Sequence, residues 1–191
     1  MARELFIRNS RLLKKPLSMS DIVSGHKWSY GTLDDQGRLD EGKTDNNGPL
    51  IIYDTENIGR GIQILNHDSS KEIHLALVFP ATEGDVRMLY EVAKRIAELW
   101  KSKQISVDGD KEDISNLDHC IEFDIKTHRS VLRNARQIFN EREYLDDILP
   151  ATRIYDVVDP AERKRYYMRP DLFAYDKYGD IDLDWVILAL N

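Results

Sequence analysis

The first 80 residues alternate between short apolar runs and clusters of turn-forming residues, and this alternation most constrains the fold. Runs of this length, with β-branched and aromatic residues, are typical of strands. They are ELFIRNS (4–10), PLIIYDT (49–55), GIQILNH (61–67) and EIHLALVF (72–79). The turn signals DDQGR, DNNGP and NIGRG lie between them. We therefore expect the N-terminal part of the chain to be built on a β-sheet.

Helical patterns follow the strands. Thr82 is predicted to open a helix because Asp85, three residues on, nearly completes a capping box. The face expected to pack on the sheet consists of Val86, Leu89, Tyr90, Ala93, Ile96, Ala97 and Trp100. A second helix is predicted from about 127 to 144, and its inward residues are Leu132, Ala135, Ile138 and Phe139. Strands followed by helices predict an α+β domain over residues 1–150, with a mixed sheet and packed helices.

Composition excludes several classes of protein. The 191 residues carry a formal net charge of −7, which argues against general nucleic-acid binding because an acidic surface repels phosphate backbones. No apolar run approaches the ~20 residues that span a membrane, and the N-terminus does not resemble a secretory signal. Cys120 is the single cysteine, so an internal disulfide cannot form. We expect a protein made in the cytoplasm with no membrane partner.

The stretch GRLDEGKT (37–44) matches the phosphate-loop pattern of nucleotide-binding proteins. A working phosphate loop needs a buried strand before it and a helix that starts at the Lys-Thr pair. Here the preceding YGTLDDQ is polar and turn-like, and the Gly-Pro pair at 48–49 would stop a helix. Asp40 and Glu41 would also repel phosphate oxygens. We predict a polar hairpin loop with a solvated Lys43 instead of a nucleotide site.

His119 and Cys120 are adjacent and could form a metal-binding pair, or a nucleophile with its base. The simpler interpretation is a small, buried, apolar Cys120 beside an ordinary histidine. No second cysteine and no helical histidine pair supports a zinc site. We therefore predict that the chain is not an enzyme and has no catalytic residues, no cofactor and no metal site.

Two further loops have simple structural interpretations. IGRGI (58–62) could clamp an anion between its glycines, but a hairpin turn or bulge is the simpler expectation. SVDGDKEDIS (106–115) is rich in carboxylates, yet the twelfth position counted from Asp108 is His119 and not the glutamate of a calcium loop. We predict a solvated acidic turn there.

The last 41 residues combine a predicted strand, TRIYDVV (152–158), with two short helices. The first helix is expected to start at Pro170 and Asp171, because proline suits the first helical position and aspartate the positive end of the helix dipole. Gly179 is predicted to end it as a left-handed cap. An apolar helix follows at LDWVILAL (183–190). Two such short helices must bury their apolar surface on a strand or a neighbouring protein.

This segment resembles the small lysin-motif-like module of baseplate wedge proteins from contractile-tailed bacteriophages. Those modules have a strand, then RPDLIAY, YGD and an LWWVI-like helix. The matching residues are Arg169, Pro170, Asp171, Leu172, Ala174, Tyr175, Tyr178, Gly179, Asp180, Leu183, Trp185, Val186, Ile187 and Asn191. The resemblance covers roughly residues 151–191. It departs from the family where Asp184-Trp185 replaces a tryptophan pair, and where the last strand of a lysin motif is missing.

The resemblance implies a β-α-α docking module at 151–191 and a structural role in a phage tail baseplate or a related contractile injection machine. Such a protein would be made in the host cytoplasm, reside in the virion tail and contact other tail or baseplate proteins in a multi-subunit ring. The residues expected to bind these partners are Arg163, Lys164, Arg165, Arg169, Asp171, Tyr175, Tyr178, Trp185 and Ile187. Two alternatives remain open: a lysin-motif protein that binds the carbohydrate of peptidoglycan, and an uncharacterised cytoplasmic binding or regulatory protein.

Overall fold

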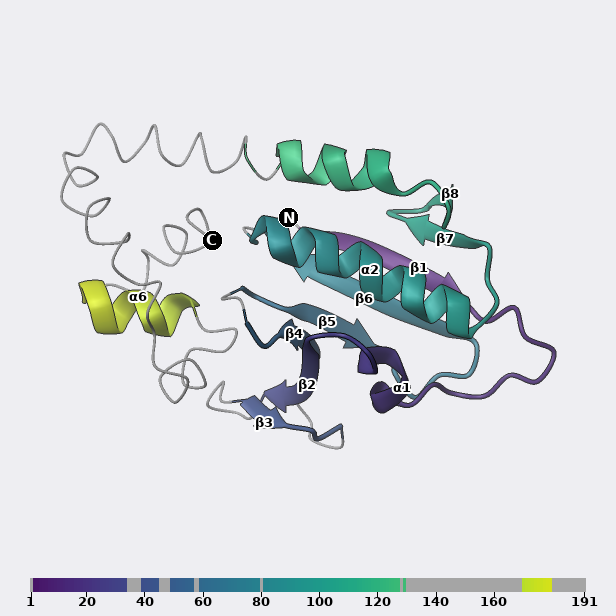
Figure 1. Ribbon diagram of the computed structural model, residues 1–191, viewed down its shortest axis with the longest axis horizontal. Coiled ribbons are helices and arrows are strands. Elements are labelled where there is room, and N and C mark those ends of the chain that lie inside the picture. Colours follow the sequence, from purple (N-terminus) through teal and green to yellow (C-terminus); the bar gives the residue numbers. More distant parts are fainter. Residues whose placement is uncertain are drawn as a thin grey trace.

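The computed structural model describes residues 2–33, 39–44, 49–56, 59–79, 81–127, 129 and 170–179. Its strands are β1 (Ala2–Arg8), β2 (Trp28–Leu33), β3 (Leu39–Glu41), β4 (Leu50–Asp54), β5 (Ile62–Leu65), β6 (Glu72–Val78), β7 (Gln104–Val107) and β8 (Asp110–Asp113). They form one sheet in the order β3-β2-β4-β5-β6-β1-β7-β8 (Figure 1). The predicted strands at 4–10, 49–55, 61–67 and 72–79 correspond to β1, β4, β5 and β6.

The sheet is antiparallel throughout, so the α+β class is confirmed but the predicted mixed sheet is wrong. The physical reason lies in the connections. β4, β5 and β6 follow one another through loops too short for the crossover that parallel neighbours require. β1 then pairs antiparallel with both β6 and β7, which places the first strand of the chain inside the sheet.

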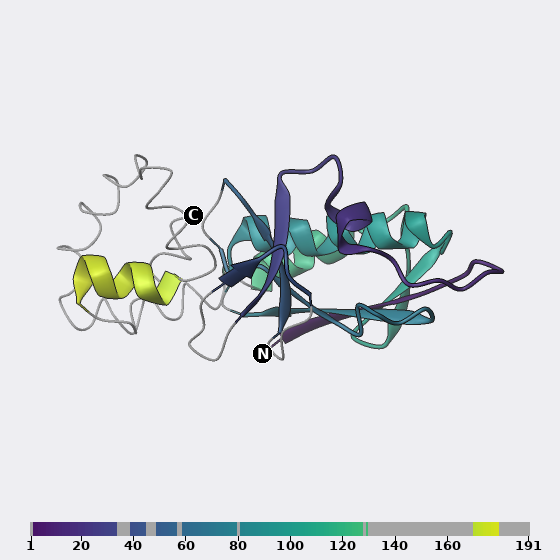
Figure 2. The ribbon, with the colours of Figure 1, turned by 90° about the horizontal axis from the view of Figure 1, so that it is seen from below.

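Three helical segments cover one face of the sheet: α1 (Met19–Val23), α2 (Glu83–Leu99) and residues 118–127 (Figure 2). The predicted capping box at Thr82 is confirmed, and α2 begins one residue later. The second predicted helix begins earlier than expected, at 118, and its continuation beyond 127 lies largely outside the described residues. A fourth helix, α6 (Pro170–Tyr178), belongs to the C-terminal segment. In the described ranges, no helix is both long and apolar enough to cross a membrane.

The main core lies between α2 and the central strands. Leu5 and Ile7 of β1 and Leu75 of β6 are fully buried on the face towards α2. The helix face predicted to pack inward, from Val86 to Trp100, is buried as well. Each fully buried Leu, Ile or Val side chain contributes about 1.5–3 kcal/mol to the stability of the fold, relative to the same side chain exposed to water. This packing fixes α2 on the sheet and orients the loops at both of its ends.

The opposite face of the sheet carries the residues that alternate with this core. Phe6 of β1 and His74 of β6 are paired in the strand register, and their rings stack with centroids 4.2 Å apart. Ser106 of β7 and Lys111 of β8 continue the same row. None of the described helices covers this side of the sheet (Figure 2).

Candidate functional site

The stretch that matches a phosphate loop forms a β-hairpin. β2 ends at Leu33, so part of the segment predicted to be turn-like is a strand, and β3 lies within the pattern itself. Lys43 and Thr44 are not helical, and the ammonium of Lys43 lies 3.2 Å from the Asp40 carboxylate. A Cβ on Gly31 of β2 would lie 2.6 Å from the carbonyl oxygen of Asp40, so glycine allows the two strands to approach. These contacts confirm the predicted hairpin loop in place of a phosphate cradle.

The IGRGI loop does clamp an anion, but the anion belongs to the protein. The backbone N–H groups of Arg60 and Gly61 donate to the buried Asp85 carboxylate at 3.0 and 3.1 Å. The N–H of Thr82 donates to the same carboxylate at 3.0 Å. Burial raises the pKa of Asp85, and the backbone donors oppose that change. A Cβ on Gly59 would lie 2.4 Å from an Asp85 oxygen, so this loop is built around the carboxylate.

A second buried carboxylate was not anticipated from the sequence. Asp124 is 1% exposed and accepts the Tyr90 hydroxyl at 2.6 Å and the Arg3 Nε–H at 2.9 Å. Arg3 also contacts Asp108 in the turn between β7 and β8. Burial, and then the bond to Asp124, raises the pKa of Tyr90. This network ties the 118–127 helix to α2 and the sheet, so we assign it a structural role.

The acidic stretch after β7 is a hairpin, not only a solvated turn. Asp108 and Gly109 both have positive φ, 48° and 103°, as a type I′ turn requires. β8 then pairs with β7 and places Glu112 beside the first turn of the 118–127 helix. The Asp-Gly signal for this hairpin was present in the sequence, but the surrounding charges obscured the strands.

Glu112, His119 and Cys120 come together at this point. A carboxylate oxygen of Glu112 lies 3.3 Å from Nε2 of His119, and the same nitrogen lies 3.3 Å from Sγ of Cys120. The three ligand-type atoms lie within 4.8 Å of one another. Cys120 is 9% exposed, and burial raises the pKa of its thiol, which disfavours the reactive thiolate. The structure therefore adds a third donor to the pair noted in the sequence.

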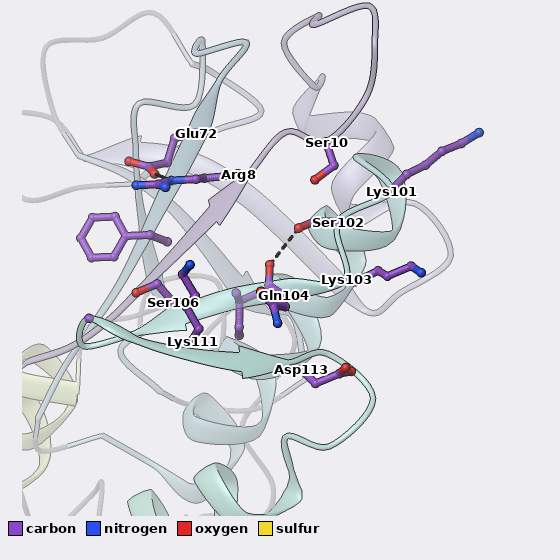
Figure 3. Close-up of a pocket in the computed structure, with 13 residues that line it drawn as sticks. Arg8, Ser10, Glu72, Lys101, Ser102, Lys103, Gln104, Ser106, Lys111 and Asp113 are labelled. Carbon is purple, nitrogen blue, oxygen red and sulfur yellow. Dashed lines mark hydrogen bonds and ion pairs between the residues drawn. The ribbon is translucent and has the colours of Figure 1, made fainter.

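A groove of about 990 Å³ lies over β6, β1, β7 and β8, on the face of the sheet that none of the described helices covers (Figure 3). Arg8 and Glu72 form an ion pair of 2.8 Å at its side. Lys101 and Lys103 extend away from the other labelled side chains, whereas Lys111 lies near Ser106. The groove therefore presents mixed charge without a converging set of catalytic groups.

The predicted C-terminal helix is present as α6, and its predicted end is confirmed. Gly179 has a φ of 76°, and its N–H donates to the Tyr175 carbonyl at 2.8 Å. Among the predicted partner-binding residues, Asp171 is half-buried, Tyr175 is exposed and Tyr178 is the last residue of α6. The others lie outside the described residues: Arg163, Lys164, Arg165, Arg169, Trp185 and Ile187. The predicted strand at 152–158 and the helix at 183–190 also lie outside them.

Comparison with known families matches residues 2–145 to a family described as Domain of unknown function (DUF4299). The chain belongs to the DUF4299 family. No curated protein and no solved structure matches the chain. The DUF4299 region contains the whole described sheet, the Asp85 and Asp124 networks, the groove and the Glu112–His119–Cys120 cluster. α6 lies beyond the DUF4299 match, in the segment with the baseplate resemblance.

Proposed function

We propose that this DUF4299 protein is a non-catalytic subunit of a multi-protein assembly, namely the baseplate of a contractile phage tail or a related injection machine. In this proposal, residues 151–191 dock the chain to neighbouring subunits. The main support for this proposal is helix α6 with its left-handed cap at Gly179. The helix starts at Pro170 and ends at the Tyr-Gly pair, where the resemblance to the baseplate module requires it.

The two faces of α6 suit a docking element. Phe173 and Ala174 are buried, at 2% and 0% exposure, so one side of the helix packs within the chain. Tyr175 is 55% exposed on a neighbouring position. An exposed tyrosine on a fixed helix can bury a large ring in a partner with little loss of side-chain entropy, and aromatic residues are enriched among interface anchors.

Charge offers a second line of support. The chain is acidic overall, but Arg163, Lys164 and Arg165 form a basic cluster just before α6. Such a cluster would steer the C-terminal segment towards acidic surface on a partner, and the attraction would weaken as salt rises.

The chemistry of the described core also agrees with a structural protein. Asp85 and Asp124 are the buried carboxylates, and both are engaged by donors from the chain itself. Each holds separate segments together in the DUF4299 region. Burial can shift the pKa of a carboxyl group for acid–base chemistry, but these two groups bind donors of the chain and stabilise the fold.

The proposal is tested by incorporation of point variants of the full chain. A tagged chain would be purified with its assembly, and sheath, tube and spike proteins would be quantified in the complex. We expect Trp185→Ala and Tyr175→Ala to lower that recovery, by about tenfold or more for a buried aromatic anchor. Leu12→Ala is a matched control, because Leu12 is a fully exposed apolar residue outside the module. Complexes without these tail proteins, or equal recovery of all three variants, would contradict the proposal.

A further inference from the structure

The Glu112–His119–Cys120 cluster has the donors of a metal site, although the sequence predicts none. This inference is independent of the proposed function. Its donors come from two regular elements: Glu112 from β8, and His119 and Cys120 from the first turn of the 118–127 helix. Regular elements hold ligands more firmly than loops do. Sequence alone could not show this cluster, because Glu112 and His119 are seven positions apart and only the β7–β8 hairpin brings them together.

The spacing of the donors fits a tetrahedral zinc ion. Zinc lies about 2.3 Å from thiolate sulfur and about 2.0–2.2 Å from imidazole nitrogen or carboxylate oxygen, so neighbouring ligands in a tetrahedron are ~3.4–3.6 Å apart. The separations here are 3.3 Å from Nε2 of His119 to Glu112 and 3.3 Å from the same nitrogen to Cys120, and the ligand atoms of Glu112 and Cys120 lie within 4.8 Å of each other. Small side-chain adjustments would be enough to receive the ion.

The type of donor selects the metal. A thiolate favours zinc and related transition metals and is a poor ligand for calcium or magnesium, which prefer oxygen. Zn²⁺ would displace the proton of the Cys120 thiol into solvent. The charges of the resulting thiolate and of one carboxylate would balance the divalent ion, with neutral imidazole as the third ligand. We propose that Glu112, His119 and Cys120 bind a single Zn²⁺ ion, with the fourth position left to water.

The surroundings of the cluster support this arrangement. The side chain of His119 is 54% exposed, so an ion can enter from solvent, whereas Cys120 faces the core. Asp124, one helical turn after Cys120, fixes this helix through its bonds to Tyr90 and Arg3. An ion held here would join β8 to the helix and stabilise the folded chain in proportion to its occupancy.

The test is a titration of the full, reduced, metal-stripped chain with Co²⁺, followed by displacement with Zn²⁺. We expect one equivalent of Co²⁺ to bind with visible bands of tetrahedral intensity and a near-ultraviolet band from the Cys120 thiolate. Cys120→Ser should abolish the thiolate band, and Glu112→Gln and His119→Ala should each weaken binding at least tenfold. His67→Ala is the matched control and should bind as the wild type does.

A second measurement covers the case in which the cysteine variant does not fold. At the same zinc concentration, Zn²⁺ should raise the melting temperature of the wild type and of His67→Ala more than that of Glu112→Gln, which changes a half-buried side chain of β8. The proposal would be overturned by octahedral Co²⁺ spectra without a thiolate band. Equal zinc stabilisation of the wild type and Glu112→Gln would overturn it as well.

Discussion

Asp85 joins two parts of the chain, the start of α2 and the IGRGI loop, through contacts of a single side chain. Its carboxylate caps α2 through the N–H of Thr82 and holds the IGRGI loop through the N–H groups of Arg60 and Gly61. The capping box was predictable, because its two members are three residues apart on a recognisable helix start. The bonds to the loop were not, because they join residues 24 and 25 positions apart and local patterns carry no information on such contacts.

Asp85→Ala is expected to destabilise the fold strongly. The substitution leaves the buried N–H groups of Gly61 and Thr82 and the part-buried N–H of Arg60 without their acceptor. Each buried donor left in this way costs about 1–3 kcal/mol. The free energy of unfolding, measured in urea, should fall by about 3 kcal/mol or more. Thr82→Ala, which removes only the capping hydroxyl, should lower it by about 1 kcal/mol. Similar losses in the two variants would show that the loop does not depend on Asp85.

Tyr90 provides a prediction that depends on pH. Its pKa is raised in the folded chain above the usual value of 10.0, so above that pH the unfolded chain releases a phenol proton that the folded chain retains. The stability contributed by Tyr90 is thus complete below pH 10 and declines as pH rises further. Tyr90→Phe should cost about 1.5–3 kcal/mol near neutral pH, since it removes a hydrogen bond to the charged Asp124. That difference should shrink between pH 8 and about pH 11. A difference that stays constant over this range would contradict the assignment.

At the scale of elements, the apolar strands were predictable and the polar ones were not. β4, β5 and β6 supply alternating or continuous apolar residues to the core, and these patterns mark them in the sequence. β8 reads Asp-Lys-Glu-Asp and has no apolar residue, because it is an edge strand whose side chains, apart from the half-buried Glu112, are exposed to solvent. The sequence did not indicate β2 as a strand, because Gly31 and Thr32 interrupt its apolar pattern. Both residues are small or polar and are buried where the strands pack closely. The apolar patterns therefore predicted the central strands of the sheet but not the strands at its edges.

The end of α6 gives a prediction at the same scale. Gly179 has a φ of 76°, and among the described atoms a Cβ there would meet none within 4 Å, so the obstacle to substitution is the backbone conformation itself. Gly179→Val should destabilise the C-terminal segment by more than ~1 kcal/mol, because β-branched residues disfavour positive φ. Asparagine tolerates this conformation, so Gly179→Asn is the matched control. Limited proteolysis should cleave the valine variant faster near residue 179. Equal cleavage rates would contradict the proposed cap.

At the scale of the whole molecule, the chain combines a DUF4299 region with a C-terminal segment beyond it. The family match ends at residue 145, close to the boundary placed at 150 from the sequence. Sequence reasoning gave the α+β class of the first part and the one described helix of the second. It could not give the antiparallel topology, since the central place of β1 depends on its pairing with β6 and β7, 64 or more residues away. The Glu112–His119–Cys120 cluster was not predicted for a different reason: the charged residues of β8 obscured the β7–β8 hairpin that places Glu112 beside His119.

We propose that residues 151–191 dock this chain into a larger assembly. The most direct measurement is the co-purification of a chain that ends at residue 150 with sheath, tube and spike proteins, in parallel with the full chain. The truncated chain retains the described sheet and α2, so we expect it to accumulate as a folded protein. We expect the full chain to be recovered with these tail proteins and the truncated chain not to be. Undiminished recovery of the truncated chain would place the docking surface in the DUF4299 region and contradict the claim.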